Sequence, residues 1–239
     1  MRVTTQAEPG VEPRTPLSRA RVLRAAVRIA DERGIESLTM RRLAEELGAE
    51  AMSLYYHVAK KDDVLDGIVD AIATEINDVV DRIDAPARAG DWKTAVRQRI
   101  LSAREVLLRH PWAPGVFESR TNVSPAVLRY YDRLVGLMRE GGLSYDLAHR
   151  ALHALGSRAL GFTQELFDPG AGPGAGPGDA ESEAMLASMA GELPHLAGMM
   201  REVVHDKPAS TLGWCDAQAE FEFGLDLILN GLDRMRERA

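Results

Sequence analysis

Polar, aromatic and cationic side chains are concentrated in residues 51–61. One face of a helix beginning near Ala51 would present Ala51, Met52, Ser53, Tyr55, Tyr56 and His57. Lys60 and Lys61 follow directly, and ammonium groups neutralise phosphate. Hydroxyl and imidazole groups can form hydrogen bonds with phosphate oxygens or base edges. These residue types, in this order, favour contact with DNA.

Two short amphipathic helices would position these side chains. Thr39 suits the N-cap of the first, because its hydroxyl can accept a hydrogen bond from a free backbone N–H. Gly48 follows the last apolar residue, where left-handed backbone ends a helix. The apolar residues that would face inward are Leu43, Ala44, Leu47, Leu54 and Val58. This pattern predicts a helix-turn-helix, whose second helix can lie in the major groove, although many helical hairpins bind nothing.

The distribution of charge favours DNA contact by the N-terminal part alone. A preceding helix, from about Arg19 to Arg33, carries several arginines and should bury Leu23, Val27 and Ala30. The whole chain has a net charge of −7, yet residues 14–61 contain ten Arg or Lys against six Asp or Glu. That segment therefore carries +4, and the −11 of the remainder would repel phosphate.

Residues 17–72 resemble the DNA-binding domain of the TetR (tetracycline-repressor) family of bacterial transcription regulators. The segments GIESLTMRRLAEELG and SLYYHVAKKDDVL carry this resemblance. The later segments LLRHPWAPGVFESR, LSYDLAHRALHALGSRALGFTQELF and FEFGLDLILNGLD are similar to the regulatory domain of the tetracycline-repressor subgroup. The resemblance implies a homodimeric repressor that binds a palindromic operator in double-stranded DNA and is released by a small-molecule effector. The alternative is a small-molecule sensor or partner-binding protein of the same fold that does not bind DNA.

The pattern along the chain predicts an all-α protein. After the helix-turn-helix, helices are expected at about 61–82, 92–109, 125–140, 144–165, 180–190, 195–204 and 217–236. Three parts are predicted: a disordered tail at 1–16, a three-helix DNA-binding domain at 17–63, and a regulatory ligand-binding and dimerisation domain at 64–239. A flexible loop is expected at 168–183 within the last part. The long helix beginning near Lys61 would join the two domains.

Composition indicates a soluble cytoplasmic protein. No apolar run approaches the length of a membrane span, and the segment MRVTTQAEPGVEPRTP lacks the apolar core of a secretory signal. Cys215 is the single cysteine, which excludes an intrachain disulfide and suits a reducing compartment.

Three features could indicate catalysis or cofactor binding, and each has a simpler interpretation. The glycine-rich segment DPGAGPGAGPGD, at 168–179, follows a helix and lacks the Lys-Ser/Thr of a P-loop. His149 and His153 share a helix face but have no third metal ligand nearby, which favours an interface or surface pair. Cys215 lies beside Trp214 and is expected to pack. We therefore expect no enzyme activity, no cofactor and no metal site.

The resemblance implies base-reading roles for four residues. Arg41 would reach a base edge, since a guanidinium can hold guanine O6 and N7 together; a phosphate contact or a surface charge is the alternative. Ala51, Met52 and Tyr55 fall where the family meets bases, and Ala51 and Met52 could contact thymine methyl groups. The tetracycline repressor has glutamine where Ala51 falls and proline where Met52 falls. Its operator preference therefore does not carry over.

Other residues of this surface are expected to contact phosphate or to support it. The phosphate set comprises Ser53, Tyr56, His57 and Lys61, and Thr39 is counted with the DNA-binding residues. Lys61 adds its charge to a helix N-terminus, which is a natural anion site. For Tyr56 the alternative is half-buried packing.

The family dimerises through two C-terminal helices from each subunit, which the resemblance places at about 145–165 and 217–236. The apolar stripes expected to form the interface are Leu152, Leu155 and Ala159 on one helix, and Phe221, Leu225, Ile228 and Leu232 on the other. A monomer's own core is the alternative for the same residues. Two-fold symmetry would also account for a palindromic operator.

The expected ligand-binding residues form a mostly apolar set, as drug-sized effectors require. They are Trp112, Phe117, Leu134, Phe162, Glu165 and Phe167, each of which is otherwise interpreted as ordinary core. The histidine that helps to hold magnesium in the tetracycline repressor falls at Phe117, although Glu165 matches a nearby acidic residue. A phenyl ring cannot bind a metal, so a magnesium–tetracycline effector is not expected. Binding would instead shift the tilt of the helix that begins near Lys61.

Overall fold

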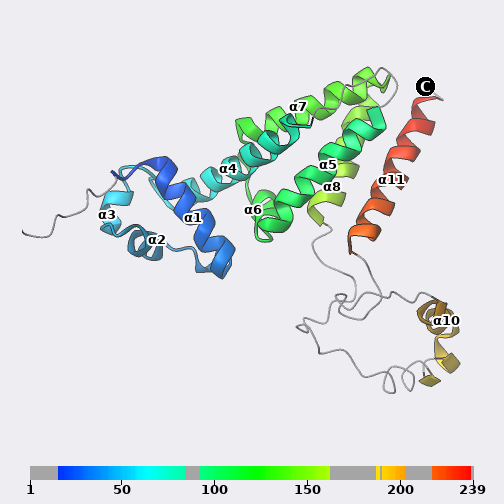
Figure 1. Ribbon diagram of the computed structural model, residues 1–239, viewed down its shortest axis with the longest axis horizontal. Helices are drawn as coiled ribbons and strands as arrows, with labels where there is room; N and C mark the ends of the chain where they lie inside the picture. The colour runs from blue at the N-terminus through cyan, green and yellow to red at the C-terminus, as the bar shows by residue number, and fades with distance from the viewer. Residues whose placement is uncertain (1–15, 84–91, 162–186, 189, 203–216, 238–239) are drawn as a thin grey trace, which may run out of the picture. The chain divides into compact units, whose positions relative to one another are not determined.

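The structure is a computed structural model that describes residues 16–83, 92–161, 187–188, 190–202 and 217–237 (Figure 1). Its elements are α1 (Arg19–Arg33), η1 (Ile35–Ser37), α2 (Met40–Leu47), α3 (Ala51–Leu54), α4 (Lys61–Asp81), α5 (Trp92–Arg109), α6 (Ala113–Ser119), α7 (Pro125–Glu140), α8 (Tyr145–Gly161), α10 (Pro194–Glu202) and α11 (Ala217–Arg236). The described part of the chain contains no strand, and the all-α prediction is confirmed. The predicted tail at 1–16 and loop at 168–183 lie almost entirely outside the described residues.

Contacts divide the chain into two compact units, Met1–Ala71 and Ile72–Ala239, which we call the N-terminal unit and the body. The division falls inside α4, so this helix belongs to both units. The sequence placed the domain boundary at residue 63, near the start of the same helix. None of the helices in the described ranges is long and apolar enough to cross a membrane.

Local signals determine where the helices of the N-terminal unit begin and end. The Ser18 hydroxyl accepts a hydrogen bond from the backbone N–H of Arg21, and Thr39 caps α2 by accepting one from the backbone N–H of Arg42 at 3.1 Å. Gly48 ends α2 with φ 61° and ψ 34°, a left-handed conformation that glycine adopts without a steric penalty. These caps confirm the predicted start of α1 and both predicted ends of α2, whereas the second helix, expected to present residues as far as His57, is α-helical only to Leu54.

The buried face of α1 matches the predicted stripe only in part, since Ala30 is buried as expected. Its core residues are Val22, Ala25, Ala26, Ile29 and Ala30, whereas Leu23 and Val27 are only half-buried. The Leu23 side chain lies against Gly67 of α4, where an added Cβ would come within 2.5 Å of Leu23 Cδ2. The helix is thus rotated from the predicted stripe, because it packs against both α2 and α4.

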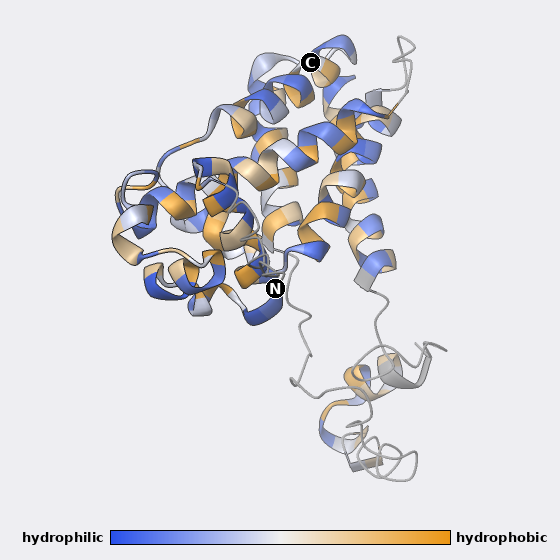
Figure 2. Ribbon diagram, turned by 60° about the vertical axis from the view of Figure 1, so that its left-hand side comes forward, coloured by the Kyte–Doolittle hydropathy of each residue, from blue (hydrophilic) through white to orange (hydrophobic). Residues whose placement is uncertain are grey.

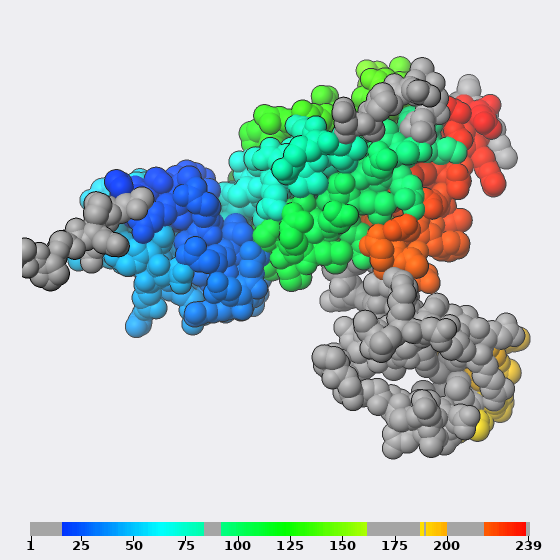
Figure 3. All heavy atoms as spheres, in the orientation of Figure 1, coloured from blue at the N-terminus to red at the C-terminus, as the bar shows by residue number. Residues whose placement is uncertain are grey.

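The core of the body lies among α5, α7, α8 and α11. Its largest fully buried side chains include Leu134, Met138, Leu155 and Phe221. Figure 2 shows hydrophobic and hydrophilic residues alternating along most helices, as expected for amphipathic helices that share one core. In the space-filling view α11 (orange to red) lies directly against the neighbouring helices of the body (Figure 3).

The sequence pattern did not reveal α6. This helix is only seven residues long and has a proline in its first turn, where the missing N–H removes no intrahelical bond. Pro111, Pro114 and Gly115 are residues that commonly interrupt helices, and no helix was expected between 109 and 125. The predicted bounds of α5, α7 and α11 are confirmed.

Candidate nucleic-acid interface and ligand cavity

The second helix of the helix-turn-helix exposes large side chains on one face. Met52 is 72% exposed, Tyr55 46% and Tyr56 89%, while Leu54 and Val58 are buried. Only residues 51–54 are α-helical, and a turn carries the chain through Tyr55 to His57. The buried Leu54 side chain thus anchors this segment, and the Met52, Tyr55 and Tyr56 side chains are exposed to solvent. The exposure of Tyr56 is inconsistent with half-buried packing.

Arg41 projects from the first turn of α2 and is almost fully exposed. Its Nε donates a hydrogen bond to Oε1 of Glu45 at 2.9 Å, one helical turn away. Such exposed pairs contribute little to stability, so the guanidinium can exchange Glu45 for a base or a phosphate at small cost.

Three of the predicted contact residues have local hydrogen-bonding roles. The Thr39 hydroxyl caps α2, and the Ser53 hydroxyl donates to the carbonyl oxygen of Glu50 at 2.6 Å. The backbone carbonyl of His57 accepts a hydrogen bond from Nη1 of Arg19 at 3.4 Å, which ties the end of the turn to α1. These hydrogen bonds therefore also fix the local backbone conformation of the predicted DNA-binding surface.

Lys61 is exposed at the start of α4. Asp62 and Asp63 share the same turn; Asp62 lies 3.5 Å from Nζ of Lys60, and Asp63 accepts a hydrogen bond from the backbone N–H of Ala59 at 2.9 Å. The two carboxylates reduce the net positive charge at this helix terminus. Lys61 supplies an exposed cation at the first position of α4, next to the exposed Lys60.

A cavity lies within the body, with an empty volume of about 630 Å³ including its open mouth. The described residues that line it come from α4 to α8. They are Ala73, Ile76, Ile100, Ala103, Leu107, Phe117, Val127, Tyr130, Tyr131, Leu134, Leu152, Leu155, Gly156, Ala159 and Leu160. Concave, mostly apolar sites of this kind bind small molecules.

The cavity includes part of the predicted ligand-binding set. Phe117 and Leu134 line it, whereas Trp112 does not. Trp112 is buried with its ring packed edge-on against His110, at 5.9 Å between ring centroids. The other three predicted residues, Phe162, Glu165 and Phe167, lie outside the described residues.

The predicted dimer stripes face the interior of a single subunit. Leu155, Phe221, Leu225 and Leu232 are buried in the core of the body, and Leu152 and Ile228 pack against it. Leu152, Leu155 and Ala159 also line the cavity. The burial of Leu155, Phe221, Leu225 and Leu232 supports the alternative, a monomer's own core, for these four residues, because helical spacing shows which residues share a face but not what that face meets. The outer face of α11 instead exposes Phe223 (63%) and Leu227 (58%).

Among the residues of the described cavity wall, only Tyr130 and Tyr131 of α7 have a polar side-chain atom. The Tyr130 hydroxyl donates a hydrogen bond to the carbonyl oxygen of Arg99 at 3.4 Å. Burial raises the pKa of Tyr130 well above the ordinary phenol value, so this residue stays neutral. Tyr131 is more exposed, and its hydroxyl has no hydrogen-bond partner within the described part of the chain.

A polar cluster joins the cavity-lining part of α4 to the end of α5. Oε1 of Glu75 accepts a hydrogen bond from Nη2 of Arg109 at 2.6 Å, and Oε2 lies 3.3 Å from Nε2 of His110. Partial burial acts to raise the pKa of Glu75, but Arg109 and His110 outweigh it and lower this pKa overall. The cluster holds α4 beside α5, next to cavity residues on both helices.

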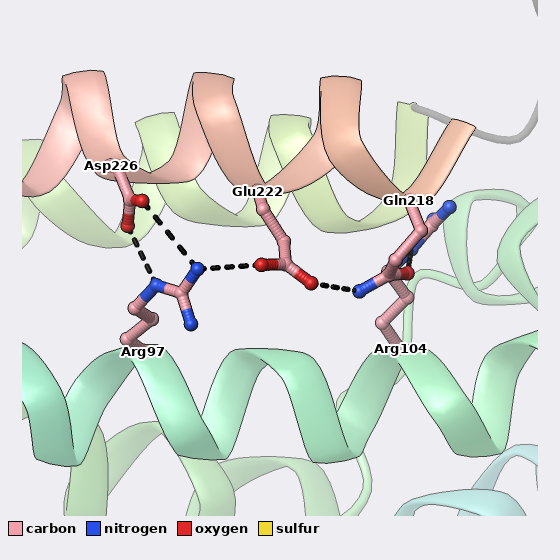
Figure 4. A network of polar contacts seen from close by, with 5 residues as sticks. All are labelled: Arg97, Arg104, Gln218, Glu222 and Asp226. Atoms are coloured by element: carbon pink, nitrogen blue, oxygen red, sulfur yellow. Dashed lines mark hydrogen bonds and ion pairs between the residues drawn. The ribbon is translucent and has the colours of Figure 1, made fainter. Parts of the chain in front are cut away.

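Polar contacts also join α5 to α11 (Figure 4). Arg97 bridges Asp226 and Glu222, with its Nε 2.7 Å from Oδ1 of Asp226 and its Nη2 2.7 Å from Oε2 of Glu222. Glu222 also accepts a hydrogen bond from Gln218, whose side-chain oxygen accepts one from Arg104. The hydrogen bonds from Arg97 to the two carboxylates raise the pKa of its guanidinium. One edge of α11 is therefore engaged within its own subunit.

The histidine pair on α8 is exposed, with its ring centroids 4.7 Å apart. Within the ranges that the structure covers, no three His, Cys, Asp or Glu side chains form a group that could hold a metal ion. Cys215 lies outside those ranges.

Comparisons with known proteins agree with the two units. Residues 22–68 match the family model "Bacterial regulatory proteins, tetR family", and residues 85–236 match "Tetracyclin repressor-like, C-terminal domain". The tetracycline repressor protein class C of Escherichia coli is 30% identical over 221 residues, which cover 92% of each chain.

Two further relatives come from Streptomyces. The HTH-type transcriptional repressor DrrR1 of Streptomyces coeruleorubidus is 34% identical over 140 residues, 59% of this chain, and the match spans 50% of that relative's length. The crystal structure of ActR from Streptomyces coelicolor in complex with actinorhodin is 27% identical, with a TM-score of 0.69 over 91% of this chain and 97% of that chain.

Proposed function

The chain belongs to the tetracycline-repressor family of transcriptional regulators, and from this premise we propose that it is a homodimeric repressor released from DNA by a small molecule. Its operator is a palindrome, which each subunit reads with α3, and the effector occupies the cavity of the body. The protein acts in the cytoplasm, where bacterial DNA lies. It needs no catalytic step.

One observation above all supports DNA binding: α3 and the turn after it bury Leu54 completely and yet expose Met52, Tyr55 and Tyr56. Folding gains nothing from three large exposed side chains on so short a segment, whereas a groove of the duplex would cover them. We assign Arg41, Ala51, Met52 and Tyr55 to base contacts. Phosphate contacts are assigned to Ser53, Tyr56, His57 and Lys61, and Thr39 supports α2 as its cap.

The cavity supports a small-molecule effector. A relative, ActR, has been crystallised in complex with actinorhodin, and the cavity of this chain is lined from α4 to α8. Ala73 and Ile76 place α4 in the cavity wall, and the same helix begins with Lys61 in the N-terminal unit. A ligand that binds one position of α4 more tightly than another would shift the population of DNA-binding dimers.

Dimerisation through the outer faces of α8 and α11 completes the proposal. Phe223 and Leu227 lie one helical turn apart on α11 and would be covered by a second copy. A two-fold dimer presents two α3 helices and therefore matches a palindromic operator.

Salt dependence of DNA binding separates this function from that of a sensor which does not bind DNA. Anisotropy of a labelled duplex of mixed sequence is measured with the full chain from low to near-physiological salt. Because phosphate contacts release counterions, affinity should fall by roughly a thousandfold between about 50 and about 200 mM salt. Absence of binding at the lowest salt would overturn the proposal and favour the sensor.

A further inference from the structure

The described wall of the cavity is almost entirely hydrocarbon. Fifteen residues line it, and only Tyr130 and Tyr131 carry a polar side-chain atom. The hydroxyl of Tyr130 is bound to the Arg99 carbonyl oxygen, which leaves the hydroxyl of Tyr131 for a ligand. Of these fifteen side chains none is charged at neutral pH.

Charged groups do lie close to the cavity, but they bind one another. Glu75 lies on α4 between the lining residues Ala73 and Ile76, and its carboxylate is held by Arg109 and His110. A charged ligand would lose its hydration on entering the cavity and would gain no counter-charge from these fifteen residues. A neutral apolar ligand would lose little and would cover the hydrocarbon wall.

Gly156 provides space on one side of the cavity. It lies in the interior of α8 and lines the cavity, and a Cβ added to it would meet no other atom within 4 Å. Glycine inside a helix is less stable than alanine, and here no neighbouring atom requires it. The missing side chain leaves room for a bound molecule to approach the backbone of α8.

We propose, on the basis of the proposed function, that the effector is an uncharged, largely apolar compound that lies against Gly156 and forms its polar contact with the hydroxyl of Tyr131. This chemistry differs from that of a metal chelate, because Phe117 in the cavity wall cannot coordinate a metal. Gly156 thus determines which ligand shapes fit, and the uncharged wall determines which ligand charges bind.

Two fluorescent probes with one skeleton test the charge requirement. N-phenylnaphthylamine is neutral, and anilinonaphthalene sulfonate carries an added sulfonate. Both are titrated into the full-length protein. The neutral probe should bind at least about tenfold more tightly, because the sulfonate would be desolvated without a partner.

Two leucine variants test the location. Gly156→Leu should weaken binding of the neutral probe at least about tenfold, since the side chain would occupy the space beside α8. Gly136→Leu is the matched control: Gly136 lies inside α7 and does not line this cavity, and its Cβ would also meet no atom within 4 Å. This control should leave the affinity unchanged. Gly156→Ala, the milder variant, should weaken binding by a smaller factor while the fold is kept.

Three results would overturn the inference. They are equal or tighter binding of the sulfonate probe, the absence of saturable binding of the neutral probe, and equal affinities of wild type and a folded Gly156→Leu variant. DNA binding is measured separately on the same samples. If the neutral probe binds at Gly156 but DNA is never bound, the cavity chemistry stands and the proposed function fails.

Discussion

The two units of this protein place their candidate functional residues in opposite ways. In the N-terminal unit, a buried anchor at Leu54 holds Met52, Tyr55 and Tyr56 outward. In the body, the residues of the cavity turn inward and are brought together from residues 73–160. A surface that enters a groove of DNA can be recognised because it exposes large apolar and aromatic side chains. A cavity is made of the same residue types as the core around it.

We expect the free energy of unfolding to depend on the interior of the body far more than on the predicted DNA-binding surface. Phe221→Ala should lower the free energy of unfolding by about 3–5 kcal/mol, since it removes a fully buried ring. Tyr56→Ala should change it by less than about 0.5 kcal/mol. Urea unfolding at one protein concentration measures both. A large loss for Tyr56→Ala would mean that this tyrosine packs in the fold.

The outer face of α11 should behave as an interface between subunits. Phe223→Glu combined with Leu227→Glu should weaken dimerisation by about 2 kcal/mol or more, because it puts charge at the centre of an apolar contact. Sedimentation velocity over a range of concentrations measures this effect. Leu128→Glu, an exposed leucine of α7, is the control and should leave the dimer intact. Equal effects of the control and the α11 variant would contradict the assignment.

Within the N-terminal unit, Arg41 and Lys61 should have different effects on DNA binding. Arg41→Ala should cost about 1–3 kcal/mol on the preferred duplex and relax specificity, whereas Lys61→Ala should weaken all duplexes similarly. Binding titrations on selected and scrambled DNA distinguish the two. If Arg41→Ala weakens both duplexes equally, then Arg41 contacts phosphate and does not read bases.

The polar cluster of Glu75, Arg109 and His110 should make the smallest contribution to the free energy of unfolding. The pKa of Glu75 is lowered in the folded state, so its contribution to stability is present above the unfolded value near 4.5 and is lost as pH falls through the folded pKa. Since the carboxylate is partly exposed, Glu75→Gln should cost less than about 1 kcal/mol at neutral pH. Unfolding of both proteins across this pH range tests the sign. A difference that grows as pH falls below 4.5 would contradict the assigned cause.

Helix boundaries could be predicted from the sequence because their causes are local. Thr39 caps a helix through its own hydroxyl, and Gly48 ends one through its own backbone. The exposed residues of α3 were also predictable, since polar and aromatic groups opposite Leu54 have no place in a core. These arguments need no knowledge of distant parts of the chain.

The partner of an apolar face could not be predicted in the same way. Phe221 and Leu225 share a face by helical spacing, but whether it meets the same subunit or a second copy depends on the packing of α5, α7 and α8. Trp112 and Phe117 look alike in the sequence, and only their positions in the fold separate a core residue from a cavity residue. The role of Gly156 could not be predicted, because the sequence does not show where the fold leaves space beside a glycine.

Selection of bound sequences from random duplex DNA, at near-physiological salt, tests the central claim most directly. The full chain is used, and the retained duplexes are sequenced. A palindrome should be enriched, because a two-fold dimer presents α3 to two half-sites. Retention of DNA without any shared sequence, or no retention at all, would contradict a sequence-reading repressor.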